Sequence, residues 1–316
     1  MNILFSTDNN YVMPTGVLMH SISINNPQDV NYYLMVNESF SKENEDKLRL
    51  IAKQYGNHIS FHTITDEVTK VLPFGKDNMP GHVSIATYYR LFVAQILPED
   101  VHKIIYLDGD MIVRGSLDKL WNTDLDGYAI AAVHDMDEQK HIDSHRLPYP
   151  METGYFNAGM QLINVDYWRK NDCLSLFMNF LKEHADKIVY HDQDVLNCCL
   201  YDKKKWVPVT YNFQNGFVLK QKFYPKAIYN EVEETLSHPV VIHYSTDLKP
   251  WNISCFHPYR NVWRRYKSLS QWKNLSLEGD YSSNLKELVR NFLLRHSLWN
   301  PNSSPYRKLP NINWHE

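Results

Sequence analysis

The sequence predicts an α/β fold with a mostly parallel central sheet flanked by helices. Short apolar runs alternate with amphipathic stretches from the N-terminus onward, which is typical of β-α-β units. The chain has 316 residues, of which 43% are hydrophobic and 22% charged, so it can bury a sizeable core. One apolar run ends on Asp108-Gly109-Asp110, which puts carboxylates where open parallel sheets bind ligands.

The first half of the chain alternates strands with helices. Strands are expected at 2–7, 31–36 and 58–64, and helices from about Tyr11 and over 41–56. Pro14 fits the first turn of its helix, because the amide that proline lacks has no helical partner there. Ser41 or Asn44 would cap the second helix, and Gly56 would end it. This order predicts helices on both faces of the sheet.

The second half is expected to contain further strands and helices. Further strands are expected at 103–107, 128–135, 159–166 and 240–245, and helices at 83–97, 171–187 and 192–200. The segment between the strands at 128–135 and 159–166 is polar and rich in His, Asp and Pro. We interpret it as an active-site loop.

Charge divides the chain into an acidic body and a basic end. The net charge is −3, which argues against nucleic-acid binding by the molecule as a whole. Residues 257–316 carry +6, the remaining 1–256 carry −9, and the basic part holds four of the eight tryptophans. We therefore expect a catalytic domain over 1–256 and a basic, aromatic, helical C-terminal extension over 257–316.

Residues 284–299 of that extension have the pattern of an amphipathic helix, with Leu288 and Phe292 on one side and Arg290 towards the other. Basic charge with tryptophan suits peripheral contact with anionic lipid at a membrane surface. The alternative is a helix that packs its apolar face on the catalytic domain.

Cysteine usage and hydropathy predict a cytoplasmic protein that does not span a membrane. The cysteines form no C-x-x-C pair and suit reduced thiols. They are Cys173, Cys198, Cys199 and Cys255. The N-terminus lacks a signal-peptide pattern, and no segment approaches the ~18–20 apolar residues of a membrane span.

The Asp108-Gly109-Asp110 turn is the strongest candidate site. Two carboxylates on one side of a strand end repel each other unless a positive charge lies between them. Oxygen ligands of this kind suit Mn²⁺ or Mg²⁺. Gly109 allows the backbone to approach a ligand closely. The alternative is a solvated turn with two surface acids.

A second polar cluster follows the strand at 240–245. His243 is a candidate ligand for Mn²⁺, and Lys249 is suited to contact a phosphate as a point charge. A histidine in a strand is more often a hydrogen-bonded core residue, which is the alternative for His243. Two acids, a histidine and a lysine together are what a metal–diphosphate site requires.

Two further segments carry polar residues at element ends. Asp192, Gln193 and Asp194 lie at a predicted helix start, where N-capping is the competing explanation for at least one acid. The small residues Asn157, Ala158 and Gly159 lie at a predicted strand start. Small residues there would allow a flat sugar or base to lie close to the backbone.

Six segments together resemble glycosyltransferase family 8, the retaining nucleotide-sugar transferases, and within it the bacterial lipopolysaccharide α-galactosyl- and α-glucosyltransferases. The segments occur in the family's order over roughly residues 1–265. They are FSTDNNYVMPTGVLMHSI, HVSIATYYRLFVAQILP, KIIYLDGDMIVRGSLDKLW, YFNAGMQLINVDYWR, YHDQDVLN and HYSTDLKPW. The turn after His243 departs from the family, because it lacks a familiar glycine.

The resemblance implies a GT-A-type nucleotide-diphospho-sugar transferase fold. It implies a UDP-glucose or UDP-galactose donor, with Mn²⁺, or alternatively Mg²⁺, bound by Asp108, Asp110 and His243. Uridine would lie at Thr7, Asp8, Asn10 and Tyr11, and Lys249 would contact the diphosphate. The residues implied around the donor sugar are Arg90, Asp135, Asn157, Asp192 and Gln193.

Retention of the anomeric configuration leaves two chemical routes. One is covalent double displacement, which needs a nucleophile under the sugar. The other is front-face attack, in which the departing phosphate takes the acceptor's proton. Because an amide is a poor nucleophile, Gln193 favours the front-face route, with Gln193 and Asp192 positioning the sugar. Asp194 is the fallback nucleophile.

The sequence therefore predicts a retaining, Mn²⁺-dependent hexosyltransferase that moves glucose or galactose to a saccharide or glycolipid acceptor of a surface glycan with α-linkage. One alternative is a nucleotide-sugar-binding protein without catalysis. The other is a metal-dependent phosphohydrolase, which would need a water-activating base or a second metal cluster.

Overall fold

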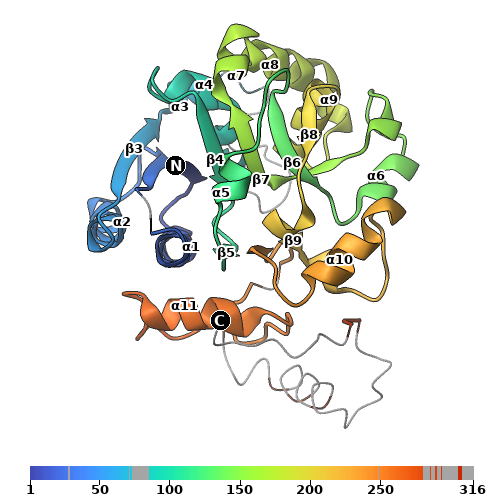
Figure 1. Ribbon diagram of the computed structural model, residues 1–316. Coiled ribbons are helices and arrows are strands. Elements are labelled where there is room, and N and C mark those ends of the chain that lie inside the picture. Colours follow the sequence, from blue (N-terminus) through green and yellow to red (C-terminus); the bar gives the residue numbers. More distant parts are fainter. Residues whose placement is uncertain are drawn as a thin grey trace.

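The central feature of the computed structural model is a seven-stranded sheet with strand order β3-β2-β1-β4-β7-β6-β8. The structure describes residues 1–27, 29–70, 72, 85–247, 249–279, 285, 289, 293 and 305–307. The strands of this sheet are β1 (Asn2–Ser6), β2 (Asn31–Asn37), β3 (His58–Ile64), β4 (Lys103–Leu107), β6 (Ile130–His134), β7 (Phe156–Asn164) and β8 (Lys204–Trp206). Only β7 runs antiparallel to its neighbours, so the predicted mostly parallel sheet is confirmed (Figure 1).

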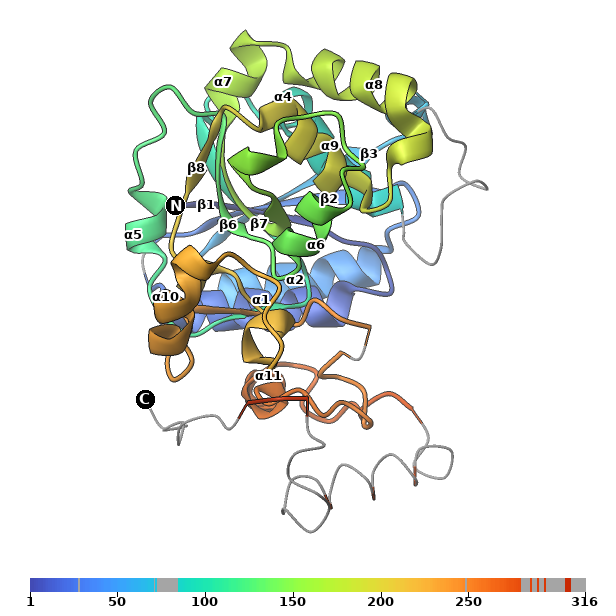
Figure 2. The same cartoon turned by 90° about the vertical axis from the view of Figure 1, so that its right-hand side faces the viewer.

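Helices cover both faces of this sheet (Figure 2). One face carries α4 (Val93–Ile96), α7 (Val165–Lys170), α8 (Cys173–His184) and α9 (His191–Leu200). The other face carries α1 (Val12–Asn25) and α2 (Lys42–Gln54). Shorter helices are α3 (Asp66–Thr69), α5 (Asp118–Trp121), α6 (Glu138–Asp143) and α10 (Tyr229–Thr235). The two apolar cores lie between the sheet and these two helical layers.

Local sequence signals explain the ends of the helices that were predicted best. Ser41 caps α2, because its hydroxyl oxygen accepts a hydrogen bond from the amide of Asn44 at 3.2 Å. Gly56 follows α2 with a φ of +71°, which only glycine adopts readily. Pro14 lies in the first turn of α1, as predicted.

The predicted helix over 83–97 is not one continuous α-helix. Among its described residues, 85–92 form a 3₁₀ helix and only Val93–Ile96 are α-helical. Its apolar side chains from Tyr88 to Ala94 are nevertheless buried, so a helical segment was predicted correctly and the helix type was not. Tertiary packing has overridden the local preference for the wider helix.

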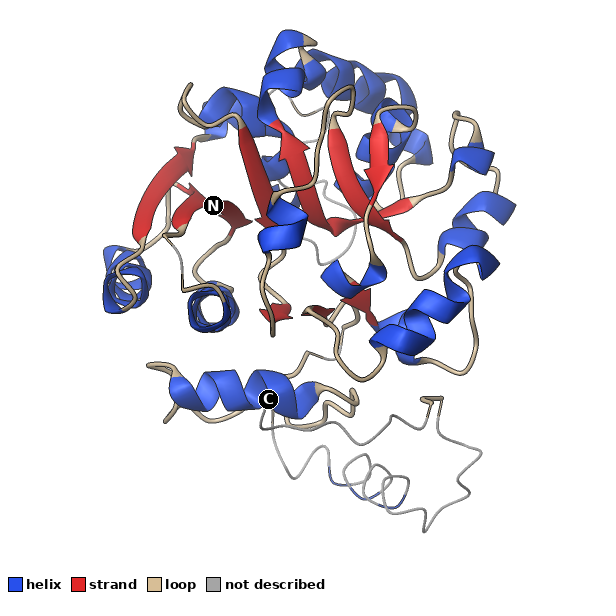
Figure 3. Ribbon diagram, viewed as in Figure 1, coloured by secondary structure: helices blue, strands red, loops and turns tan. Residues whose placement is uncertain are grey.

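The strand expected at 240–245 is present, but it does not belong to the main sheet. It is shorter, as β10 (Val241–His243), and belongs to a separate three-stranded sheet with β5 (Met111–Val113) and β9 (Phe213–Gln214) (Figure 3). β10 pairs antiparallel with β5 and parallel with β9. Short strands of two or three residues carry too little periodicity for their sheet partners to be assigned from sequence.

The part of the extension that the structure describes packs on the body of the protein. Helix α11 (Arg260–Leu269) lies against α1, and Trp263 and Trp272 are buried in the same core as α1. The predicted helix at 284–299, Trp299 and Trp314 lie outside the described residues, apart from positions 285, 289 and 293. Among the described residues, no helix has the length and apolar character needed to cross a bilayer.

Candidate active site

The Asp108-Gly109-Asp110 turn connects the two sheets. It leaves β4 at Leu107 and enters β5 at Met111, so both acids lie where the main sheet passes into the small one. In the small sheet His243 is the register partner of Met111. Strand pairing therefore brings an imidazole from more than a hundred residues away beside the two carboxylates.

Asp108, Asp110 and His243 form a compact group. One ligand atom from each lies within 4.8 Å of the others, and no other such group of three His, Cys, Asp or Glu residues is found in the described part of the chain. His243 Nε2 is 3.4 Å from Asp110 Oδ1 and 4.0 Å from Asp108 Oδ2. Lys249 Nζ is 2.7 Å from Asp110 Oδ2. The four residues that the sequence singled out are thus brought together.

A chain of hydrogen bonds fixes which nitrogen of His243 faces the carboxylates. The Gly159 amide donates to Asn157 Oδ1 at 3.0 Å, which settles the orientation of that side chain. Asn212 Nδ2 donates to the same oxygen at 2.8 Å, so Asn212 Oδ1 is left to accept from His243 Nδ1–H at 2.9 Å. His243 Nε2 therefore presents a lone pair to the acids, as a metal ligand must.

The residues present fit a divalent cation. Asp110 Oδ1 is buried and has no hydrogen-bond partner among the described residues. Burial opposes ionisation of Asp110, but the pKa of its carboxyl is held well below the usual range, chiefly by the Lys249 ammonium. An ionised, buried oxygen without a donor, next to an imidazole lone pair, is the ligand set of a hard or borderline ion such as Mn²⁺.

Gly159 makes room for this group. A Cβ on Gly159 would overlap His243 Cε1 and would lie 2.9 Å from Asp108 Oδ2. The absence of a side chain at this position thus leaves the space that Asp108 and the His243 ring occupy. The sequence interpretation, that small residues in Asn157-Ala158-Gly159 let a sugar or base lie close, overlooked this role.

Arg90 connects the metal side of the site with the acids of α9. Its guanidinium donates to Asp108 Oδ1 at 2.7 Å and lies 2.9 Å from Asp192 Oδ2. It is 5% exposed and also donates to the carbonyl of Ala158 at 2.6 Å. Burial raises the pKa of Asp192 to about 7, and Arg90 opposes this shift. One guanidinium therefore hydrogen-bonds Asp108 and forms an ion pair with Asp192.

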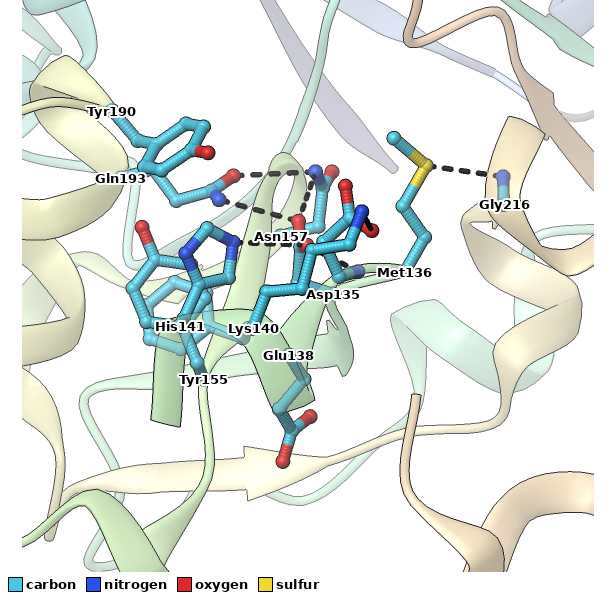
Figure 4. A network of polar contacts seen from close by, with 12 residues as sticks. Asp135, Met136, Glu138, Lys140, His141, Tyr155, Asn157, Tyr190, Gln193 and Gly216 are labelled. Atoms are coloured by element: carbon cyan, nitrogen blue, oxygen red, sulfur yellow. Dashed lines mark hydrogen bonds and ion pairs between the residues drawn. The ribbon is translucent and has the colours of Figure 1, made fainter. Parts of the chain in front are cut away.

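Three of the five residues predicted around the donor sugar, Asp135, Asn157 and Gln193, form one hydrogen-bonded cluster (Figure 4). Gln193 Oε1 accepts from the Ala158 amide at 2.9 Å and from Asn157 Nδ2 at 3.2 Å. Asp135 Oδ2 accepts from Gln193 Nε2 at 3.2 Å and from Asn157 Nδ2 at 3.0 Å. Burial opposes ionisation of Asp135, yet His141 and Asn157 lower its pKa. Both ends of the Gln193 amide are held in place.

Asp194 is an anchor for the start of α9. It is fully buried and accepts two hydrogen bonds from Arg146, at 2.6 and 2.9 Å, and one from the Tyr155 hydroxyl at 2.7 Å. The amides of Val189 and Tyr190 donate to it at 2.8 Å each. With both oxygens occupied in this way, Asp194 has no basis as a fallback nucleophile. It orders the turn before the helix, which is close to the capping role weighed for it.

The residues expected to meet uridine lie at the end of β1. Thr7 is buried, and Asp8 Oδ1 accepts from the amides of Asn10 and Tyr11 at 2.9 and 3.0 Å. Asn10 is exposed. A Cβ on Gly109 would lie 3.2 Å from Tyr11 Cδ1, so this strand end abuts the turn between the two acids. Packing against Tyr11 is a second reason for glycine at 109.

Two functional side chains escaped the sequence analysis. Asn212 orients His243, and the Tyr106 hydroxyl donates to Asp108 Oδ1 at 3.0 Å. In the sequence, Asn212 stands out only as a polar residue between two aromatic ones, Tyr211 and Phe213. A polar residue in such a run is buried only with partners, which could have marked it for attention.

A search of solved structures finds the fold in a galactosyltransferase. LgtC, solved in complex with donor and acceptor sugar analogues, superposes with a TM-score of 0.75 at 25% identity, over 90% of this chain and 99% of LgtC. The sequence profile of glycosyl transferase family 8 matches residues 2–255. The chain belongs to glycosyl transferase family 8. The expected GT-A-type fold is thereby confirmed.

Family 8 relatives with curated names support the same assignment. General stress protein A of Bacillus subtilis is 30% identical over 87% of this chain and 96% of its own length. The lipopolysaccharide 1,3-galactosyltransferase of Salmonella typhimurium is 29% identical over 87% of this chain and 80% of its own length. The chain is thus a glycosyltransferase, and the named transferase among these relatives moves a hexose.

Proposed function

We propose that this chain is a retaining, Mn²⁺-dependent hexosyltransferase that uses UDP-glucose or UDP-galactose and forms an α-linkage to a saccharide acceptor of a surface glycan. The observation that carries the proposal is the group of Asp108, Asp110 and His243, with a buried carboxylate oxygen that lacks a donor. The ammonium group of Lys249, beside Asp110, adds a positively charged side chain that suits contact with a diphosphate. Mg²⁺ is the alternative ion.

The charges of the site suit departure of a nucleoside diphosphate. A bound Mn²⁺ would balance the charge that develops on the leaving diphosphate. Lys249 lies on the Asp110 side and Arg90 on the Asp108 side, so a donor phosphate would meet fixed positive charge at either end. Thr7, Asp8, Asn10 and Tyr11 at the end of β1 are proposed to hold the uridine.

Front-face attack is the route that these side chains favour. Gln193 is held by the Ala158 amide and by Asp135, so it can orient a sugar but is a poor nucleophile. Asp192 is paired with Arg90. In this scheme Gln193, Asp192 and Asp135 fix the donor sugar, and the acceptor's proton goes to the departing phosphate oxygen.

A UDP-release screen across nucleotide sugars with Mn²⁺, followed by candidate saccharide acceptors, tests the proposal. We expect release from UDP-glucose or UDP-galactose, slow without acceptor and faster with one, and lost in Asp110→Asn. Binding of UDP-sugars without release would identify a protein that has lost catalysis. Release of phosphate from simple esters would instead indicate a phosphohydrolase.

We further propose that the enzyme works in the cytoplasm, with peripheral contact to the inner membrane face through the basic extension. The four cysteines are free, as reduced thiols are. Flotation of the full chain with anionic vesicles tests the membrane part. Replacing Lys286, Arg290 and Arg295 together by Gln should reduce flotation, and unchanged flotation would remove the role of this charge.

A further inference from the structure

A histidine from the segment between β6 and β7 adds a donor to the Asp135 carboxylate. His141, on α6, has its Nε2 at 3.3 Å from Asp135 Oδ1. Three further donors reach the same carboxylate: the Asp137 amide at 2.8 Å on Oδ1, and Asn157 Nδ2 and Gln193 Nε2 at 3.0 and 3.2 Å on Oδ2 (Figure 4). Because a carboxylate offers about four lone-pair sites, Asp135 is held through both of its oxygens.

The direction of the hydrogen bond between His141 and Asp135 follows from the charge of the acceptor. Burial opposes ionisation of Asp135, but its hydrogen bonds, with that from His141 foremost, keep its pKa below the usual range. An ionised carboxylate can only accept, so His141 Nε2 carries the proton and donates it. Both side chains are 4% exposed, so the bond forms in a low-dielectric setting, where the loss of a donor is costly.

Packing fixes the orientation of the His141 ring. The Tyr155 ring stacks on it, with centroids 4.1 Å apart and an angle of 30° between the planes, and the Tyr190 ring meets it edge-on at 4.5 Å. Tyr155 is fully buried. One turn before His141 on the same helix, Glu138 is also buried, and its Oε2 lies 2.6 Å from His134 Nδ1 at the end of β6. The imidazole therefore has little freedom to turn away from the carboxylate.

The hydrogen bond from His141 reaches the donor side of the site through Gln193. The Gln193 amide is held at both ends, because its Nε2 donates to Asp135 and its Oε1 accepts from the Ala158 amide at 2.9 Å. Gln193 is only half-buried, so part of its side chain remains open to a ligand. If the Asp135 carboxylate turned, the Nε2 end of this amide would lose its acceptor. His141 therefore stands behind the residue that is proposed to orient the donor sugar.

We propose that His141 is a positioning residue for the transfer reaction: through Asp135 it holds the Gln193 amide in the orientation that meets the donor sugar. The inference rests on the proposed transferase function and adds to it a residue outside the predicted donor and metal sites. In this scheme His141 touches neither the sugar nor the cation. Its loss should therefore slow the transfer and leave the binding of UDP with Mn²⁺ unchanged.

Two substitutions separate the ring of His141 from its hydrogen bond. His141→Phe keeps a ring between the tyrosines and removes the donor, whereas His141→Gln keeps an N–H donor near the position of Nε2. The control is His102→Phe, at an exposed histidine that pairs with Asp166 at 3.0 Å, at the opposite end of β4 from Asp108. The measurements on the full chain are UDP release with Mn²⁺ from the nucleotide sugar that the screen selects, calorimetry of UDP with Mn²⁺, and ¹⁵N NMR of the Gln193 side-chain amide without ligands.

We expect His141→Phe to lower kcat about tenfold and His141→Gln to lower it at most about threefold, with UDP affinity unchanged in both and His102→Phe like the unmodified chain. The Gln193 amide signals should shift and broaden in His141→Phe. An unchanged kcat or an unchanged Gln193 signal in His141→Phe overturns the inference, and so does an equal loss of kcat in both His141 variants. Absence of UDP release by the unmodified chain would count against the proposed function instead, and the NMR comparison would still decide whether His141 holds Gln193.

Discussion

At the scale of single residues, Gly159 shows how closely the proposed metal ligands are packed. We expect Gly159→Ala to weaken Mn²⁺ binding by at least about tenfold, because the added methyl group would overlap His243 Cε1 and crowd Asp108. Calorimetric titration of Mn²⁺ in the presence of UDP measures this. Ala158→Gly, one residue away, is the matched control. Equal affinities in the two variants would show that the glycine has no part in the site.

Asn212 provides a second test at this scale. Asn212→Leu removes the acceptor for His243 Nδ1–H and frees the ring to turn or to change tautomer. We expect Mn²⁺ affinity to fall about ten- to hundredfold, as for other partners of metal-ligating histidines. Asn25→Leu removes a comparable amide between α1 and β5 and should leave the affinity unchanged. If both variants bind Mn²⁺ like the unmodified chain, Asn212 is only a packing residue.

The proposed ligands of the site could be named from the sequence, but the residues that orient them could not. Asp108, Asp110, His243 and Lys249 have side chains whose chemistry is visible at strand ends. Asn212 and Tyr106 act through geometry that arises only when β4, β5, β9 and β10 are assembled. For the same reason Asp194 was weighed as a nucleophile, although its partners Arg146 and Tyr155 come from distant segments.

At the scale of elements, helix α1 and the segment after α11 are closely fitted. A Cβ on Gly16 of α1 would overlap the ring of Trp272. Gly16→Ala should therefore lower the free energy of unfolding by about 1–3 kcal/mol, even though alanine favours the helix by about 1 kcal/mol. Urea unfolding measures the change.

Trp272→Ala is the partner variant for this test. In that background the ring is gone, and Gly16→Ala should become neutral or stabilising, which gives a double-mutant cycle with a coupling of about 2 kcal/mol. The same cost in both backgrounds would mean that Trp272 does not pack on α1. The domain boundary between 1–256 and 257–316 stays a prediction. The double-mutant cycle measures the coupling energy between one residue on each side of that boundary, Gly16 and Trp272.

Elements were predictable where the pattern was long. The strands of the β1–β4 half of the sheet and helices α1 and α2 each have repeated apolar positions and clear stops. β5, β9 and β10 have three, two and three residues, so the small sheet that carries His243 had no periodic signal. Its existence follows from pairing between segments far apart in the sequence, which local preferences do not encode.

At the scale of the whole molecule, the buried ring of His257 makes the free energy of unfolding depend on pH. The folded chain keeps this ring neutral down to a pKa of about 3, because the ring is buried and faces Arg260. The unfolded chain binds a proton below about pH 6.5. The contribution of His257 to the free energy of unfolding is therefore fully present above about pH 6.5 and is lost as the pH falls towards 3.

His257→Gln isolates that contribution. Between about pH 7 and pH 5 the unmodified chain should lose about 2 kcal/mol more unfolding free energy than His257→Gln, measured in urea. His102→Gln, at an exposed histidine, should follow the unmodified chain. Parallel pH curves for all three proteins would contradict the buried, neutral state of His257.

The central claim for the whole molecule is that two strand ends and a distant imidazole hold one divalent cation for a diphosphate. The most direct measurement is a paramagnetic-resonance titration of free Mn²⁺ with the full chain and UDP, for the unmodified protein, Asp110→Asn, His243→Ala and the exposed control Asp46→Asn. We predict one bound ion per chain in the unmodified protein and the control, and binding weakened at least about tenfold in the two site variants. Equal Mn²⁺ binding by all four proteins would contradict the account.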